Sequence, residues 1–171
     1  MQLKLLTTIA ILLLVSAVSI AGCTVSNTPS SSTVSTDYPT SGHSKLIEGA
    51  IEQVRPSDSG NDKTQAFNVN WVSDTQAKVH IETVDTKTFD VYVKDLTFTH
   101  FPSTDAATTY YESLNNRGVW NGEWSLPPVD YYKLTGKVPT VFRANHDDWG
   151  DNGKAQYDTF VVELTSSTIS K

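Results

Sequence analysis

The chain has 171 residues, a formal net charge of −6 and a single cysteine. One cysteine excludes an intramolecular disulfide, and the scattered charges, with no Lys/Arg cluster among aromatic residues, argue against nucleic acid as a partner. The sequence contains no G-x-S-x-G, H-E-x-x-H or Walker-type motif, so it selects no familiar catalytic class.

The N-terminus combines one positive charge with a long apolar segment. Lys4 is followed by the uncharged residues 5–22, and this run ends at Cys23. A basic start, an apolar stretch and small residues are typical of a secretory signal. The 18 uncharged residues also approach the ~20 that span a membrane, so an uncleaved anchor is the alternative. Either way the following chain is expected outside the cytoplasm, because Lys4 favours a cytoplasmic N-terminus.

The residues at the end of the apolar run, Ile20-Ala21-Gly22-Cys23, resemble the lipobox of bacterial and archaeal lipoproteins. Ile20 stands where that family most often has Leu, which is a conservative change. The resemblance implies removal of residues 1–22 as a signal peptide and a diacylglycerol-type lipid on the Cys23 thiol. It therefore implies a lipid-anchored protein on the outer face of the cytoplasmic membrane or the cell surface, with the membrane as a partner.

Residues 23–42 are predicted to connect the lipidated cysteine to a folded domain. Ser and Thr occupy eleven of the nineteen positions 24–42. No apolar cluster is available in this segment to offset the entropy lost on ordering it. We expect a flexible linker up to residue 42 and a single extracytoplasmic domain over residues 43–171.

The domain is expected to begin with a helix over residues 44–54, where apolar residues recur at helical spacing between Ser44 and Pro56. Alternating apolar and polar residues then predict three antiparallel strands with one apolar face. They lie at 67–71, 79–82 and 89–98. The apolar phase of the third strand changes near Lys94-Asp95, which predicts a bulge there.

The second half of the domain is predicted to hold one further helix and two hairpins. The helix runs from Pro102-Ser103 to about residue 115, and Asn121-Gly122 predicts a tight turn in a hairpin over 119–124. Residues 129–134 fit a helical turn or a strand. A terminal hairpin is expected from 140–145 and 156–164. The predicted fold class is α+β: an antiparallel, partly bent sheet with one or two helices packed on one face.

The polar face of the predicted meander carries His80, Glu82 and Asp90. His80 and Glu82 are two residues apart in a strand, so both side chains leave the same face and can share a metal or a proton. The competing interpretation is a solvated outer face, since antiparallel sheets commonly have one wet side. Burial of the His80 face distinguishes the two.

The loop over residues 145–153 concentrates oxygen ligands, with Asp147, Asp148 and Asp151 as candidates for a loose divalent-cation site. Its spacing does not fit the EF-hand pattern, and a polar hairpin loop is the alternative. No other cofactor is predicted.

Three tryptophans form the candidate binding platform: Trp120, Trp124 and Trp149. Large aromatic rings stack on sugar rings, but in a small domain they also serve as packing.

The sequence favours a membrane-tethered binding or interaction module without catalysis, whose ligand is an unknown protein or carbohydrate. The alternative is a small exported hydrolase that uses the His80, Glu82 and Asp90 face as an acid/base site.

Overall fold

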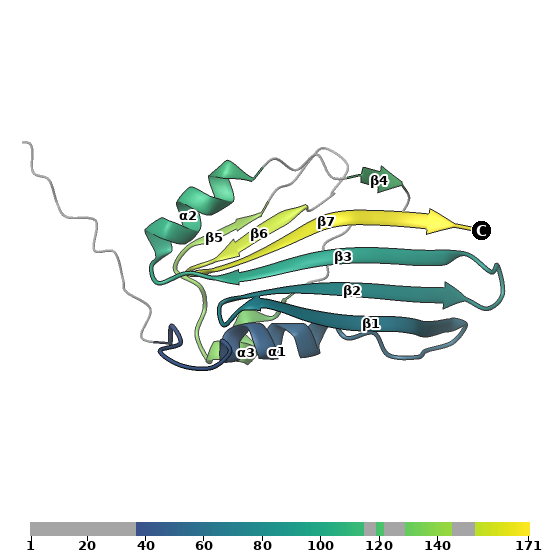
Figure 1. Ribbon diagram of the computed structural model, residues 1–171, viewed down its shortest axis with the longest axis horizontal. Helices are drawn as coiled ribbons and strands as arrows, with labels where there is room; N and C mark the ends of the chain where they lie inside the picture. Colours follow the sequence, from purple (N-terminus) through teal and green to yellow (C-terminus); the bar gives the residue numbers. More distant parts are fainter. Residues whose placement is uncertain (1–36, 115–118, 122–128, 145–152) are drawn as a thin grey trace, which may run out of the picture. The chain divides into compact units, whose positions relative to one another are not determined.

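The computed structural model describes residues 37–114, 119–121, 129–144 and 153–171, and of 119–121 only the backbone. Its strands form one sheet in the order β1-β2-β3-β7-β6-β5, and every pairing along this order is antiparallel (Figure 1). β4 lies outside this order and pairs with β7 in parallel. The elements are α1 (Lys45–Val54), β1 (Asp62–Ser73), β2 (Gln76–Asp85), β3 (Val91–His100), α2 (Thr104–Ser113), β4 (Val119–Asn121), α3 (Tyr131–Thr135), β5 (Phe142–Ala144), β6 (Lys154–Tyr157) and β7 (Phe160–Ser170). The predicted α+β class is confirmed.

Helix α1 forms where the sequence predicts it. The hydroxyl of Ser44 caps the helix by accepting a hydrogen bond from the Ile47 N–H at 3.4 Å. Arg55 at the other end is extended, as expected for a residue before Pro56. The buried face of α1 packs against β2 and β3 and consists of Ile47, Ala50, Ile51 and Val54.

The main core lies between α1 and one face of the sheet. In this core Leu96 pairs with Val79, and Phe98 stacks on Phe160 with ring centroids 6.1 Å apart. Paired residues of antiparallel strands point to the same face, so these side chains form one continuous apolar layer beneath α1.

Helix α2 contacts β6 and β7 and packs Ala107 and Tyr111 against Val161. Val161 lies between Phe160 and Val162, which both belong to the core under α1. Because successive strand residues point to opposite faces, α2 covers the other face of the sheet. The prediction that the helices share one face is therefore not confirmed.

The irregularity expected in β3 lies in its neighbour β7. Asp95 pairs with Ser166 and Leu96 with Leu164, which leaves Thr165 as the extra residue. β3 itself pairs with β2 without interruption. The change of apolar phase along β3 is thus a change of face, and not a bulge in that strand.

The terminal hairpin is shorter than predicted. Tyr157 pairs with Phe160 around a turn at Asp158-Thr159, so the predicted strand 156–164 is divided between β6 and β7. Asp158 has a φ of 49°, a left-handed conformation that Asp accepts more readily than most residues. Its carboxylate accepts the Val141 N–H at 2.7 Å, which fixes the turn to the segment before β5.

One further segment differs from the prediction, and for another the structure decides between the two predicted alternatives. Asn121, predicted at a turn, is a strand residue of β4 paired with Thr168, and residues 122–124 lie outside the described ranges. The ambiguous segment is the helix α3, which Asp130 caps by accepting the Lys133 N–H at 2.9 Å. Gly136 ends α3 with a φ of 70°.

Candidate functional site on the polar face of the sheet

The sheet face opposite α1 carries two rows of paired polar side chains beyond the part that α2 covers. One row runs across the strands through Asn68, His80, Asp95 and Ser166. The neighbouring row consists of Asn70, Lys78, Thr97 and Glu163. The uninterrupted pairing of β2 with β3 and of residues 66–71 of β1 with β2 fixes the spacing of the two rows. On β7 the extra residue Thr165 lies between them.

The first row contains a connected set of hydrogen bonds. His80 Nδ1 lies 2.8 Å from Asp95 Oδ1, and the Ser166 hydroxyl donates to the other carboxylate oxygen of Asp95. Glu82 Oε2 lies 3.9 Å from His80 Nε2. Asp95 therefore orients the imidazole through Nδ1, and Nε2 is turned toward Glu82.

The His80–Asp95 pair is partly solvated. The side chains of His80 and Asp95 are 39% and 43% exposed. Ion pairs with this much access to water contribute little to folding stability, on the order of 0–1 kcal/mol. Stability therefore gives no strong reason for this arrangement.

A hollow of about 360 Å³ lies over the two rows. This volume falls within the range of small-molecule pockets, roughly 300–1,000 Å³. The hollow is lined by Asn68, Asn70, Lys78, Val79, His80, Asp95, Leu96, Thr97 and Thr165.

Four of the lining side chains have hydrogen-bonding capacity to spare. Within the described ranges, no hydrogen bond engages the side chains of Asn68, Asn70, Lys78 or Thr97. Burial raises the Glu163 pKa, and the Lys78 charge in the same row opposes that rise. Amide and hydroxyl groups both donate and accept, whereas the ammonium only donates and the Asp95 carboxylate only accepts. The hollow thus offers mixed donors and acceptors to a polar ligand.

The predicted grouping of His80 with Asp90 is wrong. Asp90 precedes β3 at the far end of the hairpin, where its carbonyl accepts the Asp85 N–H at 3.0 Å. Asp95 occupies the position opposite His80. The prediction failed because the bulge expected in β3 reversed the assignment of its faces. Asp90 Oδ1 is also buried, and it has no hydrogen-bond partner among the described residues.

The row does not form a nucleophile–base pair. The Ser166 hydroxyl donates to Asp95 and not to His80. A serine nucleophile requires a base within hydrogen-bond reach, which here would be His80. Within the parts of the chain that the structure describes, no three His, Cys, Asp or Glu residues are grouped to hold a metal ion.

The other predicted site residues cannot be placed. Cys23, Trp124 and Trp149 lie outside the described residues, as do the candidate cation ligands Asp147, Asp148 and Asp151. Of Trp120 only the backbone is described, in β4 beside Ser167.

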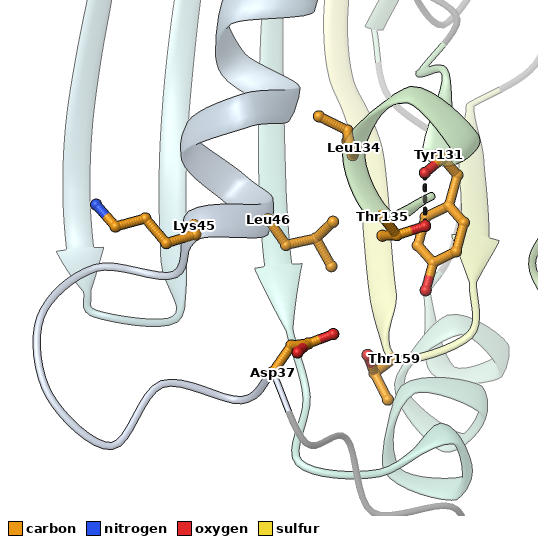
Figure 2. Close-up of a pocket in the computed structure, with 7 residues that line it drawn as sticks. All are labelled: Asp37, Lys45, Leu46, Tyr131, Leu134, Thr135 and Thr159. Atoms are coloured by element: carbon orange, nitrogen blue, oxygen red, sulfur yellow. Dashed lines mark hydrogen bonds between the residues drawn. The ribbon is translucent and has the colours of Figure 1, made fainter. Parts of the chain in front are cut away.

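A second concave region lies at the start of α1, beside α3 and the turn between β6 and β7 (Figure 2). Its volume is about 380 Å³, and its wall includes Asp37, Lys45, Leu46, Tyr131, Leu134, Thr135 and Thr159. The Tyr131 hydroxyl donates to Asp158 Oδ2 at 3.2 Å, and burial together with the Asp158 charge raises the Tyr131 pKa. Thr135 donates to the Tyr131 carbonyl at 2.8 Å. Internal hydrogen bonds therefore occupy much of the polar wall.

The end of the predicted linker contacts the domain near this second cavity. The ring of Tyr38 meets the buried ring of His100 edge-on, with centroids 5.3 Å apart. His100 Nδ1 lies 2.8 Å from the hydroxyl of Ser44, the cap of α1.

Comparisons with protein-family models, curated proteins and solved structures each found no match to the chain. Among the described residues, no helix has the length and apolar character needed to cross a membrane.

Proposed function

We propose that the chain is a prokaryotic lipoprotein, tethered through a lipid on Cys23, whose extracytoplasmic domain is a non-catalytic binding module. Its ligand site is the hollow over the polar rows of the sheet, and its ligand is rich in hydroxyl groups, as a carbohydrate is. The proposed tether depends on the lipobox resemblance at Cys23.

The observation that supports binding is the set of unengaged polar side chains around the hollow. Asn68 and Asn70 come from an exposed stretch of β1, and Lys78 and Thr97 continue the row of Asn70 into the hollow. A hydroxyl group needs both a donor and an acceptor nearby, and this lining supplies both. Asn68, Asn70 and Lys78 are exposed to water without a ligand, and Thr97 is buried beside them. The strands already hold all four side chains in register for a ligand.

The hydrolytic alternative has less support. It requires an activated nucleophile or a water positioned by His80 Nε2, whose nearest partner is Glu82 at 3.9 Å. Asp90, which this alternative assigned to the site, is distant from His80 along the hairpin, and the Ser166 hydroxyl is committed to Asp95.

A saccharide panel tests the proposal. The domain is titrated with neutral and acidic oligosaccharides of prokaryotic envelopes, and binding is measured by calorimetry. Asn70→Ala should weaken any binding by about tenfold, because one hydrogen-bonding group is worth roughly 1 kcal/mol or slightly more.

Asn61→Ala is the matched control, since Asn61 is also an exposed amide and lies in the turn before β1. Equal loss of affinity in both variants, or saccharide binding that Asn70→Ala leaves intact, would refute the assignment of the hollow. The tether is tested separately by intact mass. Protein extracted from membranes should begin at Cys23 and carry a lipid, whereas an unmodified chain of 171 residues would refute lipidation.

A further inference from the structure

The turn between β2 and β3 holds an aromatic ring in solvent. Phe89 is 72% exposed, and its φ is 65°. A left-handed conformation is unfavourable for a residue with a bulky side chain, and hairpin turns usually place Gly or Asn there. The fold therefore gains neither ring burial nor a relaxed backbone from Phe at this position.

A network of hydrogen bonds holds the turn in this conformation. The Asp85 carboxylate accepts the N–H groups of Lys87 at 2.7 Å and Thr88 at 3.1 Å. The Phe89 N–H donates to the Asp85 carbonyl at 2.7 Å. A strained residue that its surroundings fix in place is a common feature of binding sites.

The turn also exposes one positive charge close to its aromatic ring. Residues 86–89 are all exposed, and Lys87 carries the only charge among them. No ion pair of Lys87 is found within the described ranges. The neighbouring carboxylates belong to the strand ends: Asp85 accepts the turn's own N–H groups, Asp90 is partly exposed, and the exposed Asp62 pairs with Asp85. The Thr86 hydroxyl donates to the Asn61 carbonyl at 2.9 Å, and the Thr88 hydroxyl accepts the Asp90 N–H at 3.3 Å. The tip thus presents one ammonium group and one phenyl ring.

We propose that this turn contacts the lipid surface of the membrane that carries the chain, with Phe89 entering the headgroup layer and Lys87 beside anionic phosphates. The inference rests on the proposed tether. A lone aromatic ring among Lys and Thr suits the headgroup layer, where apolar and charged groups meet. A protein partner would instead favour a wider apolar patch around the ring.

The geometry allows a tethered domain to reach the membrane with this turn. The turn lies at the end of the sheet opposite the start of α1 (Figure 1), and the ten residues of β2 separate the two ends by about 34 Å. A chain of fourteen residues, the number from Cys23 to residue 36, spans at most about 50 Å. The turn can therefore contact the membrane while the start of α1 stays about 34 Å from it, within reach of the tether. Tethering also makes a weak contact effective, because it keeps the local lipid concentration high.

A tryptophan placed at the turn tests the proposal. The mature chain is reconstituted in vesicles of phosphatidylcholine and phosphatidylglycerol that contain spin-labelled lipid. In Phe89→Trp we expect fluorescence quenching beyond that of the four native tryptophans. Phe142→Trp is the control, since Phe142 is also an exposed aromatic residue, 58% accessible, but lies on β5. Equal quenching of the two variants, or none in either, would overturn the proposal.

The substitution Phe89→Asn removes the ring but keeps a residue that tolerates the left-handed conformation of the turn. Asn accepts the left-handed conformation, so the melting temperature should stay the same or rise. Hydrogen exchange of residues 86–90 on vesicles should lose its lipid-dependent protection, with docking weakened about tenfold or more. Protection that Phe89→Asn leaves unchanged, or that occurs on whole cells but not on vesicles, would contradict a lipid contact.

A second anchor distinguishes failure of the tether from failure of the docking. The chain from residue 23 is attached through an N-terminal histidine tag to nickel-chelating lipid in the same vesicles. Quenching in this form but not in the native form would refute lipidation and leave docking supported. Absence of quenching from both forms would refute docking.

Discussion

Mild acid is expected to destabilise the domain through His100. This side chain is 1% exposed, and Asp37 lies close enough for its charge to act on the imidazole. Burial lowers the His100 pKa from 6.5 to about 4, although the Asp37 charge opposes the shift. The unfolded chain therefore binds a proton near pH 6.5, whereas the folded chain binds it only near pH 4.

The sign and size of the effect follow from this difference. Above pH 6.5 His100 is neutral in both the folded and the unfolded state, so its full contribution to the free energy of unfolding is present. As the pH falls toward about 4, the unfolded state gains a proton that the folded state does not, so stability is lost. At 1.36 kcal/mol per pKa unit the loss approaches about 3 kcal/mol.

Urea unfolding followed by circular dichroism at several pH values between 7.5 and 4 measures this loss. His100→Asn is the comparison, because its amide oxygen can replace Nδ1 beside Ser44 but does not titrate. The variant is expected to have lower stability at neutral pH and a flatter pH dependence. If both proteins lose stability in parallel between pH 6.5 and 4, the assignment to His100 is wrong.

Three further substitutions test the fold by denaturant or thermal unfolding. Tyr38→Ala should lower the melting temperature and reduce the acid sensitivity, because it opens His100 to water; an unchanged melt would mean that the Tyr38–His100 contact is not stabilising. Phe98→Ala should cost about 3–5 kcal/mol, since Phe98 is fully buried, and a cost below 1 kcal/mol would contradict the core as described. Gly136→Ala should cost about 1 kcal/mol from its φ of 70° alone, because no atom lies within 4 Å of the added methyl group; a neutral result would place that residue outside the left-handed region.

Local patterns predicted the local structure well. The α1 helix was predictable because its cap, its apolar spacing and its terminating proline all lie within one short segment, residues 44–56. His80 and Glu82 were assigned to one face of β2 by the two-residue period alone, and they do lie together.

Long-range pairing accounts for what the sequence could not predict. Asp95 was missed as the partner of His80 because its face depends on the register of β3, which a shift in apolar phase obscured. The extra residue Thr165 belongs to a strand some 70 positions away. The parallel pairing of β4 with β7 and the packing of α2 on the second face likewise depend on contacts between distant segments.

The hollow on the polar face is proposed to bind the ligand of a tethered module. Nuclear magnetic resonance titration of the isotope-labelled domain with a saccharide found by the panel tests this most directly. If the hollow binds the saccharide, the largest amide shifts fall at Asn68, Asn70, Lys78 and Thr97, with little change around α3. Shifts confined to the cavity at Tyr131, or to any region away from these two rows, would contradict it.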